Sequence, residues 1–324
     1  MKKPNTLQQA IVYFADPDNC LNWMVALRWR NGVECPTCGR TDARFLSNQR
    51  KWQCKSVHHH RQFTVKVGTI FEDSPISLDK WLVAVWMVAN CKNGVSSYEI
   101  ARAIGVTQKS AWFMLHRIRL AMQRRSFMKL GGPGSEVEVD ETFIGGKARF
   151  MHVGTARRRK LDSTGVGGKI AVVGLLERDG EVRATVIPNR RRKALHGEIQ
   201  KHVEPGSTVY TDDLMSYLEM PNEFQHEVID HAQRYVRGNV HTNGLENFWS
   251  LLKRGLKGTY ISVEPFHLFR YLDEQAFRYN NRGSKENPIG DGERFEMVLS
   301  HVLGKRLTYA EVTGKVGATD SLPN

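Results

Sequence analysis

Apolar residues recur at helical spacing in two stretches of the first 122 residues. The first stretch covers residues 1–30, where the recurrence predicts helical structure on both sides of Pro17. The second stretch predicts three helices, over residues 78–91, 98–104 and 108–122. Residues that cap helices, namely Ser, Thr and Gly, stand at their boundaries. We therefore expect this part of the chain to be mainly helical.

A different pattern follows, in which short apolar runs rich in β-branched residues alternate with amphipathic segments. The runs predict strands over residues 136–142, 169–176, 182–187, 207–210 and 227–229. The amphipathic segments predict helices over residues 193–203, 214–218 and 244–257. A turn of a few residues joins the second strand to the third, so this pair is expected to be antiparallel. The alternation indicates an α/β fold in which helices flank a sheet.

These patterns divide the chain into four expected parts. They are an N-terminal helical segment with a small β unit (1–70), a helical region (71–130), an α/β domain (131–290) and a C-terminal tail (291–324), which is mostly polar over residues 304–324. The run Gly131-Gly132-Pro133-Gly134 is expected to be a linker at the start of the third part, because regular elements do not tolerate it.

The balance of charges favours a polyanionic partner. The 324 residues include 47 Lys and Arg against 34 Asp and Glu, which gives a net charge of +13 at pH 7. Two Arg-Arg-Arg-Lys runs, at residues 157–160 and 190–193, are either solvated loops or phosphate contacts. No apolar run reaches the ~18 residues of a membrane helix, and the N-terminus lacks the apolar centre of a secretory signal. We therefore expect a cytoplasmic, nucleoid-associated protein with no membrane partner.

Three closely spaced cysteines indicate a metal site. Cys35 and Cys38 form a Cys-x-x-Cys turn, Gly39 permits that turn to be tight, and Cys54 follows after fifteen intervening residues. Zinc binds four sulfur or nitrogen ligands, and three cysteines with one histidine are an ordinary structural set. We predict a zinc ribbon with short strands over residues 43–46, 51–53 and 62–67. The alternative is three free thiols beside a surface histidine cluster.

The fourth zinc ligand is less well defined than the cysteines. Val57 stands where a second Cys-x-x-Cys turn would have its last cysteine. His58 is the nearest donor, and His59 or His60 could substitute for it.

Two of the predicted helices have the arrangement of a helix-turn-helix. Residues 98–104 and 108–122 are joined by a short turn that contains glycine. In such a unit the second helix lays its first residues against base edges or phosphates, here Gln108, Lys109 and Ser110. An ordinary helical hairpin that binds nothing is the alternative.

Three carboxylates occupy positions from which they could converge. Asp140 and Asp212 lie near the ends of predicted strands, and Glu246 lies at the edge of the apolar stripe of the last predicted helix. Lys253, seven residues after Glu246, shares that edge. Carboxylate oxygens are the ligands that Mg²⁺ and Mn²⁺ prefer, and a pair of such ions promotes in-line displacement at phosphorus. We therefore predict a metal site at the three acids, with Lys253 as a phosphate contact.

Five stretches of the sequence resemble a known family. They are CPTCGR, QFTVKVGTIFEDSPISLDKW, EVEVDETFIGGK, VYTDDLMSY and HTNGLENFWSLLKRGLKGTY. They are similar to bacterial insertion-sequence transposases of the DDE type, in the family with a zinc ribbon before an RNase H-like catalytic domain. The resemblance implies an RNase H-like mixed sheet flanked by helices, and Asp140, Asp212, Glu246 and Lys253 as catalytic residues. It also implies cleavage of double-stranded DNA at the element's terminal repeats and strand transfer into target DNA, by a homo-oligomer on the DNA.

The resemblance leaves two residue assignments open. Some relatives use Asn as the third residue, so Asn243 is the alternative to Glu246. Asp213 is the neighbour of Asp212, which we prefer because it lies nearer the strand. Two other functions also remain alternatives, a DNA-binding regulator with an inactive nuclease-like domain and a repair or resolving nuclease.

Overall fold

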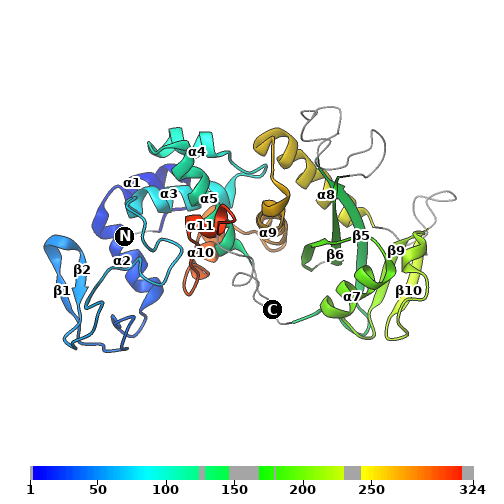
Figure 1. Ribbon diagram of the computed structural model, residues 1–324, viewed down its shortest axis with the longest axis horizontal. Coiled ribbons are helices and arrows are strands. Elements are labelled where there is room, and N and C mark those ends of the chain that lie inside the picture. The colour runs from blue at the N-terminus through cyan, green and yellow to red at the C-terminus, as the bar shows by residue number, and fades with distance from the viewer. Residues whose placement is uncertain (1–2, 124–127, 146–167, 179, 230–241, 316–324) are drawn as a thin grey trace. The chain divides into compact units, whose positions relative to one another are not determined.

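A computed structural model describes residues 3–123, 128–145, 168–178, 180–229 and 242–315 of the chain (Figure 1). The chain divides into two compact units, one formed by Met1–Gln123 with Asn281–Asn324 and the other by Arg124–Asn280. None of the described helices combines the length and the apolar character that a membrane crossing requires.

The first unit begins with two short helices. Helix α1 covers Leu7–Phe14 and helix α2 covers Pro17–Arg28. Side-chain oxygens of Thr6 and Asp16 accept backbone N–H groups in the first turns of these helices. Proline at the first position of α2 has no N–H to leave unpaired, so the predicted break at Pro17 is confirmed.

A three-stranded antiparallel sheet follows the two helices. Its order is β1-β2-β3, with β1 over Arg44–Leu46, β2 over Lys51–Gln53 and β3 over Gln62–Phe63. A short 3-10 turn, η1 (Ser47–Gln49), joins β1 to β2. The rings of Trp52 and Phe63 stack with their centroids 6.0 Å apart, and Trp29 meets Trp52 edge-on. The strands fall where the sequence predicted them, although the third is shorter.

Three further helices follow, and the last two of them carry the side-chain caps that the sequence predicted. The three helices are α3 (Leu78–Asn90), α4 (Ser97–Ile104) and α5 (Gln108–Met122). Ser96 and Glu99 form a reciprocal capping box at the start of α4. Gly105 ends α4 in the left-handed conformation, at φ +64°, and Thr107 caps α5.

The last described part of the chain belongs to this same unit. Helix α10 (Asp291–Ser300) packs against α3, and the short helix α11 (Tyr309–Val312) packs against α5. Figure 1 shows α10 in orange and α11 in red among the blue and cyan helices. Phe295 is fully buried, with its ring 5.0 Å from that of Trp86 and 5.6 Å from that of Phe14. Where the sequence predicted a C-terminal tail from residue 291, the structure has a helix whose apolar side completes a core.

The second unit is built on a five-stranded mixed sheet of order β10-β9-β5-β6-β7. The strands are β5 (Glu136–Ile144), β6 (Ile170–Glu177), β7 (Val182–Ile187), β9 (Thr208–Asp212) and β10 (Gln225–Ile229). Strands β5, β6 and β7 are antiparallel neighbours, whereas β9 runs parallel to β5 and β10 runs parallel to β9. A small parallel pair, β4 (Leu130–Gly131) and β8 (Val203–Glu204), includes the first glycine of the expected linker.

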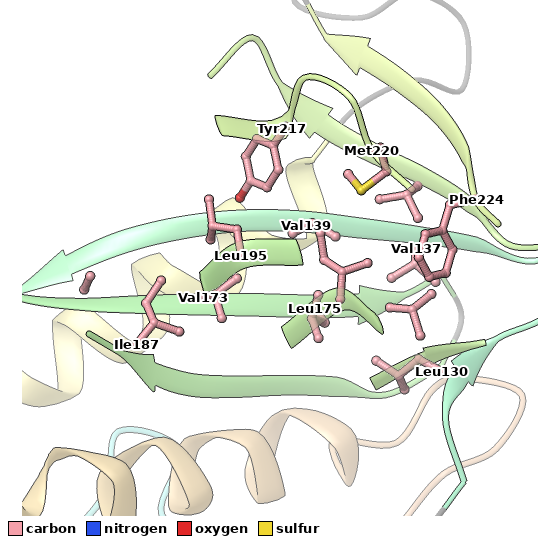
Figure 2. Close-up of a cluster of buried hydrophobic side chains, with 14 residues drawn as sticks. Leu130, Val137, Val139, Val173, Leu175, Ile187, Leu195, Tyr217, Met220 and Phe224 are labelled. Atoms are coloured by element: carbon pink, nitrogen blue, oxygen red, sulfur yellow. The ribbon is translucent and has the colours of Figure 1, made fainter. Parts of the chain in front are cut away.

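Helices cover both faces of this sheet, which confirms the predicted α/β class. They are α7 (Arg192–His202), α8 (Asn243–Gly255), and α9 (Leu268–Asn280). One core joins α7 to the sheet through residues such as Leu195, Val139 and Val173 (Figure 2). The other core joins α8 and α9 to the opposite face. The predicted helix at residues 214–218 is a single 3-10 turn, η3 (Met215–Tyr217).

Two glycines allow α8 to approach the sheet closely. A Cβ atom on Gly174 of β6 would lie 2.6 Å from Cζ2 of Trp249, and one on Gly244 would lie 2.3 Å from Cδ2 of Leu176. Glu138, which is buried on β5, accepts the backbone N–H of Leu245 at 3.0 Å. A carboxylate interacts favourably with the positive end of the helix dipole at the first turn of a helix. Glu138 therefore holds the N-terminal end of α8 on the sheet.

Candidate metal centres

Two of the three predicted acids meet on neighbouring parallel strands. Strands β5 and β9 pair with Glu136 opposite Thr208 and Glu138 opposite Tyr210, a register that brings Asp140 level with Asp212. One carboxylate oxygen from each of Asp140, Glu141 and Asp212 lies within 4.8 Å of the others. These three residues are named the carboxylate cluster below.

Hydrogen bonds fix the side chains of the cluster. Trp249 of α8 donates from Nε1 to Asp140 Oδ2 at 2.9 Å, and the N–H of Glu141 donates to Asp140 Oδ1 at 2.8 Å. The N–H of Leu214 donates to Asp212 Oδ1 at 3.1 Å. These hydrogen bonds therefore orient the carboxylates of both predicted acids.

The carboxylates raise one another's affinity for protons. Burial raises the pKa of Asp140 to about 7, and the negative charges of Glu141 and Asp212 raise it as well. The hydrogen bond from Trp249 lowers this pKa, but by less. Burial and the charge of Asp212 also raise the pKa of Glu141, whereas its hydrogen bond from Tyr217 lowers it. A divalent cation would offset this repulsion, so the donor set and its charge fit a hard metal ion.

The sequence reasoning missed Glu141. Tyr217 donates to Glu141 Oε2 at 2.7 Å, and Arg190 Nη1 lies 3.9 Å from its Oε1. Arg190 comes from the second basic run, while the run at residues 157–160 lies outside the described residues. Alternation along a strand places Glu141 and Asp140 on opposite sides, which is why the pattern singled out only one of them.

Glu246 is placed near this site but not inside the cluster. It lies in the first turn of α8, where its side chain is exposed, and it precedes Trp249 by three residues. Residues three apart are neighbours on a helix surface, so Glu246 adjoins the indole that contacts Asp140. Among the described residues, the group within 4.8 Å includes neither Glu246 nor Asp213. The structure thus brings Asp140 and Asp212 together. It places Glu246 about one helical turn before Trp249, the residue of α8 that contacts Asp140.

Position on α8 distinguishes Glu246 from Asn243. At about 100° per residue, Glu246 lies about 60° around the helix from Trp249 and Asn243 lies about 120° away. Lys253 lies about 40° from Trp249, one turn further along the helix and on the same side as Glu246. Helix geometry therefore favours Glu246 over Asn243.

The cysteines gather around one of the three histidines. One donor atom from each of Cys35, Cys38, Cys54 and His58 lies within 4.8 Å of the others. Cys35 Sγ is 3.4 Å from His58 Nε2, and Cys38 Sγ is 3.5 Å from Cys54 Sγ. A hydrogen bond from the backbone of Arg40 lowers the pKa of Cys38, which favours the thiolate that binds metal. Three sulfurs and one imidazole nitrogen are a donor set that fits zinc.

Local geometry explains why His58 joins the cysteines. Gly39 has the left-handed φ of +72° that the tight cysteine turn requires, and its N–H donates to the carbonyl of Cys35 at 2.8 Å. Val57 is 91% exposed, so it points away from the cluster. His59 and His60 are also exposed and contact each other at 3.1 Å. The other two cysteines, Cys20 and Cys91, lie outside this cluster.

The predicted DNA-facing residues of α5 differ in what they contact. Gln108 donates to Ser97 Oγ of α4 at 2.9 Å, and the N–H of Ser110 donates to its own cap, Thr107. Lys109 is exposed, with its Nζ 4.8 Å from the ring centroid of Tyr309 in α11.

Comparison with known proteins identifies the family. Residues 129–280 match the ISXO2-like transposase domain, and residues 16–60 match a transposase zinc-ribbon domain. An uncharacterized protein in transposable element ISH50 of Halobacterium salinarum is 31% identical over 261 residues, which cover 75% of this chain and 84% of that protein. The chain belongs to the ISXO2-like transposases. An uncharacterized transposase-like protein of Haemophilus influenzae is 34% identical over 102 residues, or 31% of this chain and 82% of that protein. The first match covers the five-stranded sheet with α7, α8 and α9, and the second covers the cysteine cluster.

Proposed function

We propose that this transposase cleaves phosphodiester bonds at the ends of a transposable element and transfers the freed strand into target DNA, with Mg²⁺ or Mn²⁺ as cofactor. The observation that carries the proposal is the meeting of Asp140 and Asp212 on adjacent parallel strands, inside the domain that matches the family. Carboxylates crowded in this way bind divalent cations well.

We assign the metal ligands to Asp140, Asp212 and Glu246, and the phosphate contact to Lys253. A pair of divalent ions bound there would activate the attacking oxygen and stabilise the leaving oxygen. Trp249 orients Asp140, and Glu138 holds the end of α8 that carries Glu246. Lys253 lies on the same side of α8 and supplies positive charge for a phosphate.

Both proposed steps are displacements at phosphorus. In the first, a water oxygen forms a bond to the phosphorus, the bond to the 3′ oxygen breaks, and that oxygen leaves as a hydroxyl after taking up a proton. In the second, this 3′-hydroxyl attacks a target phosphodiester and releases a target 3′-hydroxyl. Each step breaks one phosphorus–oxygen bond and forms another, so no external energy source is needed.

The first unit is proposed to recognise DNA. Its cysteine cluster would bind Zn²⁺ through Cys35, Cys38, Cys54 and His58, and α4 and α5 would act as a helix-turn-helix on the terminal repeats. The segments 1–70, 71–130 and 131–290 would then serve as ribbon, helix-turn-helix and catalytic regions. Two element ends must be brought together, so we propose a homo-oligomer on the DNA, acting in the cytoplasm on the nucleoid.

The experiment is cleavage of a duplex that carries the terminal repeat flanking the gene. We expect Asp140→Asn and Asp212→Asn to bind the duplex as the unsubstituted protein does and to cleave it about 10³-fold more slowly. Asp213→Asn is the matched control and should retain cleavage. Retained cleavage by Asp140→Asn would refute the proposal. A pre-cut end tests the second step, because a nuclease without strand transfer leaves that end unjoined.

A further inference from the structure

The chain makes an unusual turn directly after α8. Residues Leu256–Tyr260 extend the helix as one turn of π-helix, and Ile261 follows with φ +60° and ψ −56°. The N–H of Ser262 donates to the carbonyl of Tyr260 at 2.6 Å, which closes a three-residue γ-turn with Ile261 at its centre. This form of the turn is rare and strained, and a β-branched residue with positive φ is an outlier.

Packing on both sides holds Ile261 in this conformation. On one side, the Tyr260 hydroxyl donates to the buried carboxylate of Glu274 in α9, and its ring meets that of Tyr271 with the centroids 4.8 Å apart. On the other side, Val263 packs on the core that α8 and α9 form with the sheet. The turn cannot relax unless it leaves these partners.

The strained turn directs an apolar side chain into solvent. Ile261 is 82% exposed, which is unusual for a large aliphatic residue that the backbone holds so firmly. Phe266 in the following 3-10 turn, η5 (Pro265–His267), is 59% exposed. At this exposure the Ile261 side chain contributes little packing to the chain itself, and the strained backbone that holds it outward suits contact with a partner.

The surrounding charge identifies the chemistry of that partner. Lys253 and Arg254 lie in the last turns of α8, and Lys257 is exposed in the π-helical turn four residues before Ile261. Glu264 is the one acidic residue from 253 to 270. An apolar tip among cations is complementary to duplex DNA, whose phosphates attract the cations while the tip enters between base pairs.

We propose that Ile261 is a wedge that inserts between two base pairs of the bound duplex and unstacks them; this inference rests on the proposed function. Fifteen residues separate Glu246 from Ile261, which corresponds to roughly 22 Å along a helix at 1.5 Å per residue. That length spans about six base pairs of duplex at 3.4 Å each. With α8 lying along the duplex, the unstacked step lies about six base pairs from the phosphodiester that is cleaved.

The test uses the full chain and the terminal-repeat duplex with 2-aminopurine placed at one position after another. Binding is measured without divalent cation, so that the duplex stays intact. With the unsubstituted protein, we expect fluorescence to rise at one step, about six base pairs from the cleavage point. Ile261→Ala should abolish that rise and leave the affinity for the duplex within about threefold, whereas Ile261→Leu, which keeps the apolar bulk, should retain the rise. Val186→Ala, at an exposed apolar position on edge strand β7, is the matched control.

Cleavage provides the second readout. We expect Ile261→Ala to cut the paired duplex about tenfold more slowly and to recover when the duplex carries a mismatch at the unstacked step. A merely structural role for Ile261 would show no such recovery. Cleavage by the unsubstituted protein with no fluorescence rise at any step would overturn the wedge and leave the proposed function intact, whereas no cleavage of any duplex would refute the proposed function. A change of oligomeric state in Ile261→Ala, with the fluorescence unchanged, would assign the residue to a protein interface instead.

Discussion

Trp249 Nε1 lies 2.9 Å from Asp140 Oδ2, so a helix and a strand 109 residues apart in sequence meet at the carboxylate cluster. The contact requires a glycine at position 174, which pairs with Asp140 across β5 and β6 and leaves room for the indole. Trp249 therefore couples the position of α8, and of Glu246 on it, to the orientation of the first acid.

Substitution of Trp249 by Phe tests this coupling. The variant keeps the aromatic packing but removes the donor to Asp140, so we expect metal binding to weaken by about 10- to 100-fold, as when other groups that orient metal ligands are removed. The Mn²⁺ concentration for half-maximal cleavage measures the effect. Trp23→Phe, in the first unit, is the control for the loss of an indole. An unchanged Mn²⁺ requirement in Trp249→Phe would show that the hydrogen bond is dispensable.

The third acid can be assigned by comparing two neighbours on α8. We expect Glu246→Gln to reduce cleavage by about 10³-fold, because it removes a ligand charge, and Asn243→Ala to reduce it by less than about tenfold. Single-turnover cleavage at saturating duplex measures both. The reverse order of effects would assign the role to Asn243.

Zinc content distinguishes the three adjacent histidines. We expect His58→Ala to lose most of the bound zinc after dialysis, because the variant lacks one ligand of the proposed Cys₃His set. His59→Ala should retain the zinc. Elemental analysis measures the metal. Chelation should also disorder the small sheet β1–β3, which would be seen as a change in the fluorescence of Trp29 and Trp52. Equal zinc in the two variants would exclude His58 as the ligand.

Two partly buried histidines predict a loss of stability in acid. Burial lowers the pKa of His226, whose Nε2 lies 2.8 Å from Thr211 Oγ1, and the charge of His196 lowers it further. Burial also lowers the pKa of His196. A lowered pKa means that the unfolded chain binds these protons more tightly, so the free energy of unfolding falls as the pH drops below the ordinary value of 6.5.

Urea unfolding at a series of pH values measures this dependence. His226→Asn keeps a hydrogen-bonding side chain but cannot take up a proton, so its stability should fall less steeply between pH 7 and 5.5. A control is His301→Asn, in the first unit. Parallel curves for the His226→Asn variant and the unsubstituted protein would contradict the prediction.

The strain at Ile261 predicts a stabilising substitution. A non-glycine residue in this conformation costs about 1–3 kcal/mol, and glycine adopts positive φ without that cost. Glycine also makes the unfolded chain more flexible, which lowers the free energy of unfolding by up to about 1 kcal/mol. We expect Ile261→Gly to raise the free energy of unfolding by about 1 kcal/mol. Ser262→Gly, at the next position but without positive φ, should lower it. Destabilisation of equal size in both variants would show that Ile261 is not strained.

The sequence predicted those elements whose signals are local. The caps of α4 and α5 and the turn at Gly39 depend on neighbouring residues, and the structure has them as predicted. Helix α10 was missed because its apolar residues, among them Phe295, find their partners about 200 and more residues earlier in the chain. A short apolar pattern in a polar context does not reveal such a partner.

The same distinction applies to the metal centres. The strand pattern predicted Asp140 and Asp212 as candidate ligands, and the parallel pairing of β5 and β9 brings them level. Asp212 ends β9 as predicted, whereas Asp140 lies in the middle of β5, which continues to Ile144, and not near its end. Glu141 joins them through Tyr217 of η3 and Arg190 just before α7, and no local pattern predicts that these two side chains reach the same carboxylate. The choice of His58 among three adjacent histidines likewise depends on the direction of each side chain, which follows from the path of the backbone between Cys54 and Gln62.

Helix α10 also has a consequence for synthesis. Phe295 fills the space between Phe14 and Trp86, so the unit that contains the first 123 residues lacks part of its interior until the ribosome has made nearly the entire chain. The inserted second unit can fold first, although it comes later in the sequence. A messenger cut short between codons 281 and 290 would yield a protein whose second unit is whole and whose first unit is left with an open hydrophobic cavity.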